Sequence, residues 1–198
     1  MVGSRRPEVV LDAGCGEGAY LAAIDAPVRL GSDISKPAVR LAARRYRDLR
    51  FAVASSFDLA LDDGAVDVVV SVFAPRAFAE FHRVLRVGGA IVIASPGPDH
   101  LAGLTELVYG QVKPHEQRPH VSDDEGLAEA PSERERVRFE LHLTEAADIE
   151  SLLHMTPYWW RANEARRAEI AAATELVTTV DVIVTLHERP PGFTVAGP

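Results

Sequence analysis

Short apolar runs separated by amphipathic stretches recur along the first half of the chain. The apolar runs, each predicted to be a strand, cover residues 9–11, 28–33, 51–53, 66–72 and 90–94. The helical patterns between them cover residues 20–24, 38–46 and 78–85. Strands that alternate with helices at this spacing are typical of right-handed βαβ units. The pattern therefore predicts an α/β fold built on a mostly parallel sheet.

Local signals mark where two of these helices begin and end. Ser35 is a good N-cap and Pro37 suits a first helical turn, so a helix is expected to start there. The Val87-Gly88-Gly89 sequence is expected to stop the helix over 78–85. The fifth strand should then begin after these glycines, at residue 90.

The second half of the chain has a different pattern. Residues 114–135 are polar and acidic, with three prolines, which predicts a mobile insert. Residues 137–143 alternate apolar and polar side chains, and 177–186 form a β-rich run, so these two strands are expected to form an antiparallel edge. Thr144 is expected to cap a helix. One domain over 1–198 accommodates all of these elements.

Composition narrows the class of protein. Hydrophobic residues make up 47% of the chain and charged residues 25%, as in ordinary globular proteins. No stretch has the apolar length of a membrane span, and residues 1–7 contain no apolar signal core, so a cytoplasmic protein without a membrane partner is expected. A single cysteine, Cys15, excludes an internal disulfide and a Cys-rich zinc site, and no metal is expected.

The net charge of −8 is unevenly distributed. Residues 1–100 hold equal numbers of acidic and basic side chains, so the whole excess of acid lies in 101–198. Proteins that bind a phosphate backbone usually present a basic face. The overall charge leaves room for a local basic patch but argues against autonomous nucleic-acid binding.

The strongest local signal is a glycine-rich turn that follows the first strand. Gly14, Gly16 and Gly18 allow the chain to approach a ligand closely. Asp12 precedes these glycines and Glu17 lies among them. Two carboxylates would repel the pyrophosphate that a dinucleotide-binding loop holds. They suit a ligand that carries a cationic ammonium and a sulfonium.

A second acid, Asp33, ends the second strand, where a carboxylate can accept hydrogen bonds from ribose hydroxyls. Together with the Gly14–Gly18 loop and the turn over 83–89, it resembles the class I S-adenosylmethionine-dependent methyltransferases. The resemblance covers roughly the first hundred residues. It implies a Rossmann-like fold with helices on both faces of the sheet, and S-adenosylmethionine as the cofactor. It also implies that Asp33 holds the ribose and that the loop lies against the methionine portion.

The same resemblance indicates where the adenine would lie. Alignment on Asp67 places Ser55 and Ser56 where many members of the family have an acid near the adenine amino group. Because serine replaces the acid, adenine recognition is expected to use backbone contacts and packing by Phe57.

Three further stretches, 53–56, 95–101 and 155–162, narrow the resemblance. With the glycine motif, they are similar to the large-subunit ribosomal RNA guanine-N1 methyltransferases, which include housekeeping and macrolide-resistance enzymes. This implies ribosomal RNA as the partner. Members of that family carry an N-terminal zinc module before the glycine motif. This chain reaches the motif by Gly14 and has one cysteine, so it is expected to lack the module.

The acceptor base is expected to lie against aromatic rings. Tyr158, Trp159 and Trp160 supply aromatic faces within one turn, and Arg161 could meet a phosphate or carbonyl group. Adjacent rings cannot all face one cleft, so at least one of them is expected to pack in the core.

Asp99 and His100 follow the fifth strand and are candidate acceptors for the guanine N1 proton. The alternative is that Asp99 caps a helix and His100 is structural. Two other functions stay open: a small-molecule methyltransferase, or a chain that binds the cofactor without turnover. The oligomeric state does not follow from the sequence.

Overall fold

The computed structural model describes residues 5–112, 131–156, 158 and 164–189. The chain divides into two compact units. Unit 1 is drawn from residues 1–95, 118–135 and 184–198, and unit 2 from residues 96–117 and 136–183. The expectation of one domain over 1–198 stays a prediction.

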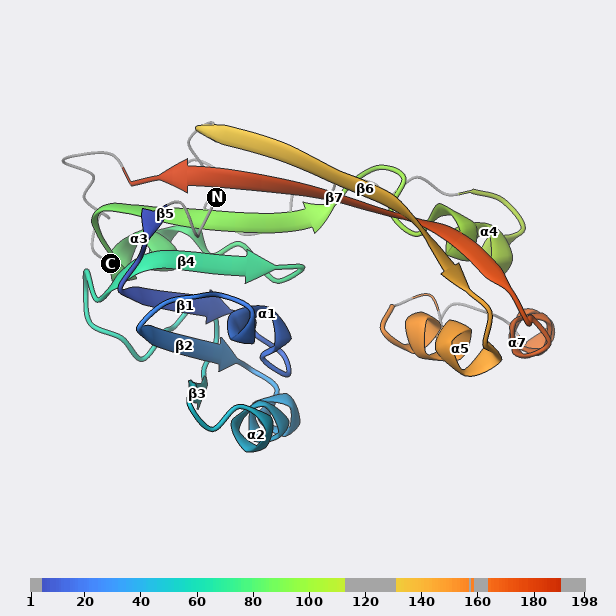
Figure 1. Cartoon of the computed structure of the whole chain (residues 1–198), viewed down its shortest axis with the longest axis horizontal. Helices are drawn as coiled ribbons and strands as arrows, with labels where there is room; N and C mark the ends of the chain where they lie inside the picture. The colour runs from blue at the N-terminus through green and yellow to red at the C-terminus, as the bar shows by residue number, and fades with distance from the viewer. Residues whose placement is uncertain (1–4, 113–130, 157, 159–163, 190–198) are drawn as a thin grey trace. The chain divides into compact units, whose positions relative to one another are not determined.

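Seven strands form one sheet in the order β3-β2-β1-β4-β5-β7-β6 (Figure 1). Their bounds are β1 Val9–Ala13, β2 Val28–Asp33, β3 Arg50–Val53, β4 Val66–Val72, β5 Leu85–Pro96, β6 Glu133–Leu143 and β7 Leu176–Glu188. The first five pair in parallel, and β7 runs opposite to its neighbours β5 and β6 (Figure 1). The predicted mostly parallel sheet with an antiparallel edge is confirmed.

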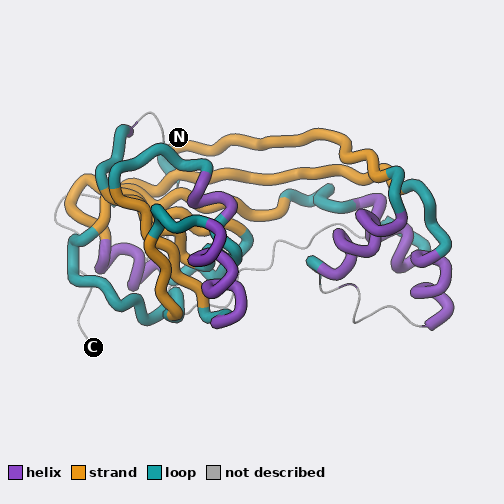
Figure 2. The backbone as a smooth tube through the Cα atoms, turned by 60° about the horizontal axis from the view of Figure 1, so that its bottom comes forward, coloured by secondary structure: helices purple, strands orange, loops and turns teal. Residues whose placement is uncertain are grey.

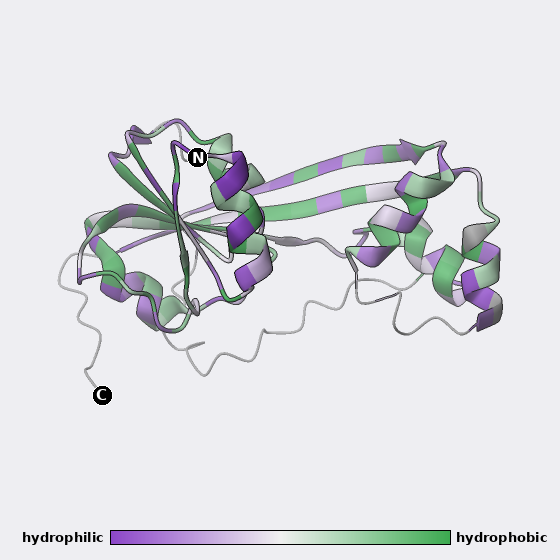
Figure 3. Cartoon of the chain, turned by 90° about the horizontal axis from the view of Figure 1, so that it is seen from below, coloured by the Kyte–Doolittle hydropathy of each residue, from purple (hydrophilic) through white to green (hydrophobic). Residues whose placement is uncertain are grey.

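Unit 1 has a helix layer on each face of its strands, as Figure 2 shows. Its helices are α1 Ala19–Ala22, α2 Lys36–Arg45 and α3 Phe78–Val84. Alternate side chains of a strand point to opposite faces, so neighbours in sequence enter different cores. Val10 of β1 packs in the cluster that contains Leu21 of α1, and Leu11 packs in the cluster that contains Phe81 of α3. The mainly apolar strands of Figure 3 follow from burial on both faces.

Among its described residues, unit 2 has three helices that pack around an apolar core of their own. They are α4 Ala102–Tyr109, α5 Ala146–His154 and α7 Glu164–Ala171. Leu104 of α4, Ile149 and Leu153 of α5, and Ile170 of α7 are all buried in one cluster. Sequence patterns did not predict α4 or α7, since each has only two turns and no strong cap signal.

The fifth strand begins earlier than predicted. The helix ends at Val84, and β5 starts directly at Leu85 rather than after the glycines. The register shifts between the Val66–Leu85 and Val68–Ala90 pairs, so residues 86–89 bulge opposite Asp67. Gly88 has a φ of +78°, which only glycine adopts easily. The two glycines therefore accommodate a bulge within the strand and do not end a helix.

Two expectations about the second half are wrong in detail. Thr144 does not cap a helix, because α5 begins after Glu145, and that residue makes no side-chain cap hydrogen bond. Strand β6 starts at Glu133, four residues before the predicted strand and inside the predicted polar insert. Only this charged start was missed, because the first four residues of β6 are exposed and give no apolar signal. Residues 113–130 of that insert lie outside the described residues.

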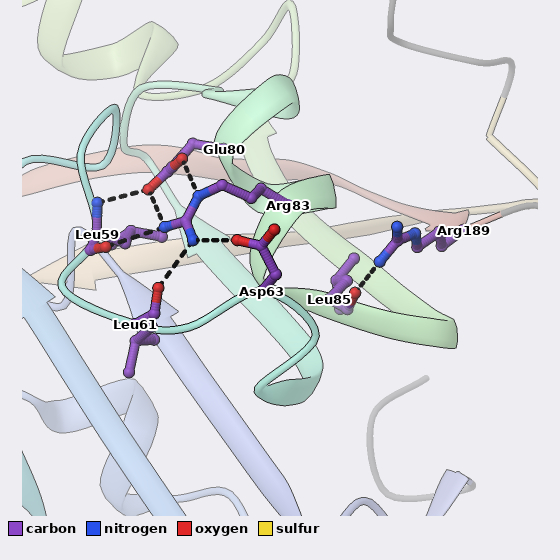
Figure 4. A network of polar contacts seen from close by, with 7 residues as sticks. All are labelled: Leu59, Leu61, Asp63, Glu80, Arg83, Leu85 and Arg189. Atoms are coloured by element: carbon purple, nitrogen blue, oxygen red, sulfur yellow. Dashed lines mark hydrogen bonds and ion pairs between the residues drawn. The ribbon is translucent and has the colours of Figure 1, made fainter. Parts of the chain in front are cut away.

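An arginine on α3 fixes the loop that follows β3 (Figure 4). Arg83 donates to both carboxylate oxygens of Glu80 at 2.7 and 2.8 Å, and to the carbonyl oxygens of Leu59 and Leu61 at 3.0 and 2.8 Å. It also pairs with the exposed carboxylate of Asp63 at 2.8 Å. Glu80 in turn accepts the Leu59 N–H at 2.7 Å. The planar guanidinium suits this set of acceptors, whereas an ammonium would reach fewer of them.

We expect Arg83→Met to lower the free energy of unfolding by roughly 2–3 kcal/mol, because it leaves the Glu80 carboxylate and two loop carbonyls without their charged donor. Arg83→Lys should recover only part of this loss. Chemical denaturation measures both variants, with the exposed Arg134→Met as the control that should stay within about 0.5 kcal/mol of wild type. Equal stability of Arg83→Met and Arg134→Met would contradict the role assigned to the network.

Candidate functional site

The glycine loop joins the carboxyl end of β1 to α1 in unit 1. Gly14, Gly16 and Gly18 all have positive φ angles, of +86°, +52° and +81°. A Cβ atom on Gly14 would lie 2.4 Å from the Cβ atom of Ala74, so this position has no room for a side chain. A Cβ atom on Gly16 would meet nothing within 4 Å, which leaves its backbone open to a ligand. The loop therefore combines close packing on one side with open space at Gly16.

The carboxylate of Asp33 ties this loop to the next βα turn. Its Oδ2 accepts the Gly16 N–H at 2.8 Å, and its Oδ1 accepts the Ser35 N–H at 2.7 Å. The Ser35 hydroxyl in turn accepts the Ala38 N–H, so Ser35 is the N-cap of α2 as predicted. Each carboxylate oxygen has a further lone pair, so Asp33 can accept two more hydrogen bonds while it holds the loop.

Asp12 is buried just before the loop, with 1% of its surface exposed. Neither of its carboxylate oxygens has a hydrogen-bond partner among the described residues. Burial, reinforced by the nearby Asp33 charge, raises the Asp12 pKa to about 7. Buried Asp67 differs, because its carboxylate accepts the N–H groups of Glu8 and Val9 at 2.8 Å and pairs with Arg86. Asp12 is thus a buried acid without a hydrogen-bond partner among the described residues, which makes it a candidate functional group.

Cys15 fills space within this loop. It is buried, and a Cβ atom on Gly31 of β2 would lie 2.9 Å from its Sγ. Burial, together with the charges of Asp12 and Asp33, raises the pKa of the thiol to about 12. The thiol stays protonated at neutral pH and is a poor nucleophile.

The predicted adenine-side residues follow β3 at the same edge of the sheet. The N–H of Ala54 donates to the Asp33 carbonyl at 3.2 Å, which places Ser55 next to the end of β2. The Ser55 hydroxyl accepts the Phe57 N–H at 3.2 Å, and Ser56 is half-buried. The Phe57 side chain is half exposed and can cover an aromatic ligand. The Arg83 network holds the next part of this loop.

One residue at this edge escaped the sequence reasoning. Phe73 follows β4 and has a left-handed backbone with φ +52°, which is strained for a bulky residue. Phe73 is 48% exposed, and the next residue, Ala74, packs against Gly14. The strand order changes direction between β1 and β4, so Phe73 and the glycine loop flank the topological switch point. The Phe-Ala-Pro sequence directly after a predicted strand was the signal that could have pointed to Phe73.

The two proton-acceptor candidates lie in unit 2, in a network around Asp181. Arg136 binds both carboxylate oxygens of Asp181, and the Asp99 N–H donates to the same carboxylate at 2.9 Å. The Asp99 carboxylate lies 3.2 Å from both Arg136 and Arg138. His100 Nδ1 accepts the Asp181 N–H at 3.3 Å, so the neutral imidazole carries its proton on Nε2. These contacts anchor both residues, and their catalytic roles stay predictions.

Of the four predicted acceptor-side residues, only Tyr158 lies within the described residues. Its ring meets Tyr109 edge-on in unit 2, with 5.8 Å between the ring centroids, and it packs partly buried against the unit 2 core. Trp159, Trp160 and Arg161 lie outside the described residues. Within the part of the chain that the structure describes, no cluster of acids, histidines and cysteine could hold a metal ion. No helix there is long and apolar enough to cross a membrane.

Comparison with known proteins agrees with this geometry. Residues 11–93, which contain the glycine loop, Asp33 and Phe73, match the family model described as a methyltransferase domain. The solved structure of YcgJ from Bacillus subtilis superimposes with a TM-score of 0.60 over 94% of each chain. At 15% identity, this likeness shows a shared fold.

Two curated relatives give the family. A Micromonospora griseorubida protein assigned to 23S rRNA guanine-N1 methylation is 38% identical over 191 residues, which are 93% of this chain and 64% of the relative. The chain thus spans just under two thirds of that relative's length. The 23S rRNA (guanine(748)-N(1))-methyltransferase of Streptomyces fradiae is 36% identical over 193 residues, 92% of this chain and 68% of that enzyme. The chain belongs to the family of 23S rRNA guanine-N1 methyltransferases, on the class I S-adenosylmethionine-dependent methyltransferase fold.

Proposed function

We propose that this chain binds S-adenosylmethionine at the glycine loop of unit 1 and methylates guanine N1 in large-subunit ribosomal RNA. The observation that carries the proposal is that two carboxylates, those of Asp12 and Asp33, lie at this loop. Asp33 is already oriented by two backbone N–H groups, and Asp12 is buried without a partner. A ribosomal RNA substrate places the protein in the cytoplasm.

The residues of unit 1 fit this cofactor. Asp33 has the lone pairs to accept the two ribose hydroxyls, and the open space over Gly16 admits the methionine portion. The half-exposed Phe57 ring would cover the adenine, with Ser55 and Ser56 beside it. When bound, the cofactor supplies an electrophilic methyl group on a sulfonium.

Asp12 acts at a distance, because its carboxylate is sealed from solvent. A cation held against the loop would be attracted by Asp12 and Asp33 together, and this attraction is strong where water is excluded. The same cation would stabilise the ionised form of Asp12, whose pKa is otherwise raised to about 7. Ionisation of Asp12 therefore destabilises the free protein, and binding of the proposed cationic ligand would offset this cost.

Phe73 is the residue of unit 1 best placed to meet the acceptor. It follows the strand next to β1, and its strained backbone is typical of residues that position a ligand. An exposed ring at this point can stack on a base that has left its helix, as the family's acceptor requires. Tyr158, Trp159, Trp160 and Arg161 stay proposed acceptor contacts, and Asp99 and His100 stay proposed proton acceptors.

The reaction itself is the first test. The chain should transfer a tritiated methyl group from S-adenosylmethionine to unmethylated large-subunit ribosomal RNA, and digestion should yield labelled 1-methylguanosine. Phe73→Ala should reduce the rate by removing about 1–3 kcal/mol of base stacking, with cofactor affinity nearly unchanged. Cofactor binding without any labelled nucleoside would favour a small-molecule acceptor or an inactive homologue.

Asp12→Asn should raise stability and lower cofactor affinity. Because the folded pKa of Asp12 is raised to about 7, its ionisation makes the folded chain less stable as pH rises from about 4 to 7. At pH 8 the variant should therefore be more stable than wild type, by at most about 4 kcal/mol. Affinity for S-adenosylmethionine should fall roughly 5- to 30-fold at pH 8, since the variant lacks the attracting charge.

Asp67→Asn is the matched control for Asp12→Asn. Its carboxylate is satisfied by two N–H groups and Arg86, so the change should destabilise the chain and leave cofactor affinity nearly unchanged. Denaturation at pH 6 and 8 and calorimetric titration measure both variants. Wild-type affinity should rise more between these pH values than that of Asp12→Asn. Parallel pH profiles would show that Asp12 does not act on the ligand.

Asp33→Ala should remove ribose recognition and loosen the loop. The loss of charge-assisted hydrogen bonds is worth roughly 1.5–3 kcal/mol per bond. The variant also frees the N–H groups of Gly16 and Ser35, so affinity alone cannot separate the two roles. Titration with S-adenosylhomocysteine and its 2′-deoxy analogue separates them. Wild type should prefer the ribose form, and the variant should bind both about equally; a preference retained in the variant would contradict the ribose contact.

A further inference from the structure

An exposed basic segment, residues 36–50, covers α2 and leads into β3. It contains one acid, Asp48, and six cations, all exposed. The cations are Lys36, Arg40, Arg44, Arg45, Arg47 and Arg50. The segment's formal charge of +5 stands against −13 for the remainder of the chain, within the total of −8. The basic segment is thus a concentrated positive region on an otherwise acidic protein.

The contacts of the segment leave its charge uncompensated. Asp48 pairs with Arg29 of β2 at 2.8 Å, so it does not neutralise the basic segment. Within the described part of the chain, none of the six cations forms an ion pair. Arg45 stacks on the adjacent Tyr46 ring, with 5.5 Å from its guanidinium carbon to the ring centroid, and keeps its charge.

Helix stability does not account for these charges. Cations near a helix C-terminus are favourable, which explains Arg44 and Arg45. Lys36 lies in the first turn, where an acid would be favoured, and this turn contains none. Lys36, Arg40 and Arg44 are spaced i, i+4 and i+8, about 6 Å apart along the helix, and like charges at this spacing destabilise a helix by about 0.2–0.5 kcal/mol per pair. The row is unfavourable for the isolated fold, which indicates an external partner.

The packing of α2 holds this row outward. Val39 and Ala42 are buried, whereas Lys36, Arg40 and Arg44 are exposed; α2 alternates hydrophobic and hydrophilic residues along its length (Figure 3). Helices that insert into a membrane surface need their apolar face free. The face of α2 that remains available is cationic, which suits phosphate groups in water.

We propose that the basic segment binds the phosphate backbone of the RNA that flanks the methylated guanine. This inference rests on the proposed function for the identity of the polyanion. The helix begins three residues after Asp33, so the basic segment starts beside the proposed cofactor edge of unit 1. Evenly spaced cations on a rigid helix can each meet a phosphate, and the acidic remainder of the chain repels RNA from other surfaces. The charge pattern therefore orients the RNA as well as binding it.

The test is a triple variant, Lys36→Gln, Arg40→Gln and Arg44→Gln. All three side chains are exposed and form no ion pairs within the described residues, and glutamine preserves helix propensity, so the melting temperature and S-adenosylmethionine affinity should match wild type. Fluorescence anisotropy with a labelled, unmethylated large-subunit ribosomal RNA fragment measures binding from 50 to 200 mM salt. The slope of log affinity against log salt should fall in magnitude by about 2–3, with roughly tenfold or greater loss of affinity at 100 mM.

A matched pair of single variants separates the effect of losing a charge within the basic segment from that of losing a charge elsewhere. Arg40→Gln and Arg134→Gln each remove one exposed arginine, and only the first should weaken RNA binding and raise the KM for RNA with kcat unchanged. Equal RNA affinity and salt slope for wild type and triple variant would overturn the inference. The inference would also be overturned if wild type bound vesicles containing phosphatidylserine but not RNA, and the triple variant bound neither. The nucleoside assay decides the proposed function separately, because RNA binding is measured without methyl transfer.

Discussion

Two backbone N–H groups converge on the carboxylate of Asp33, and the arrangement of the site depends on this convergence. One comes from Gly16 in the loop after β1, and the other from Ser35 at the start of α2. A single side chain therefore fixes two consecutive βα turns at the carboxyl edge of the sheet. Gly14 supports the same geometry from the other side, because only a glycine fits against Ala74 after β4. Three neighbouring strands are thus held in register at the edge where ligands of this fold class bind.

The neighbouring Asp12 shows what this arrangement costs the free protein. An unpartnered buried carboxylate costs more than most surface interactions can offset, and burial accordingly raises the Asp12 pKa to about 7. Asp67, buried in the same sheet, avoids the penalty through N–H groups and Arg86. The contrast between the two buried aspartates separates Asp67, whose carboxylate is satisfied within the fold, from Asp12, which we propose serves a ligand. Stability given up at a site of this kind is typical of functional residues.

The sequence predicted the parts of the fold whose signals are local. Buried parallel strands are continuous apolar runs, so β1 and β4 were found almost to the residue; β2, over 28–33, was also found, and Ser35 was identified as a cap. The start of β5 was missed because glycine signals a turn and a bulge alike, and only strand pairing distinguishes the two. The first four residues of β6, 133–136, are all charged and gave no apolar signal, whereas the alternation over 137–143 predicted the rest of the strand. These strand boundaries depend on tertiary contacts, which a single sequence does not show.

The site was predictable to the same extent. The glycine loop and Asp33 stand out in the sequence as a motif, and the structure shows that Gly16 donates a hydrogen bond to Asp33; their roles toward a cofactor stay predictions. The strain at Phe73 is a property of the folded backbone and has no counterpart in composition. The basic segment over 36–50 was missed for another reason, because the net charge of −8 for the whole chain does not reveal a local excess of cations. Folding places its apolar residues inward and its cations outward on α2, and a segment of mixed composition becomes a surface of one sign. The fold thus gives an acidic chain a strongly positive helix beside its proposed cofactor loop.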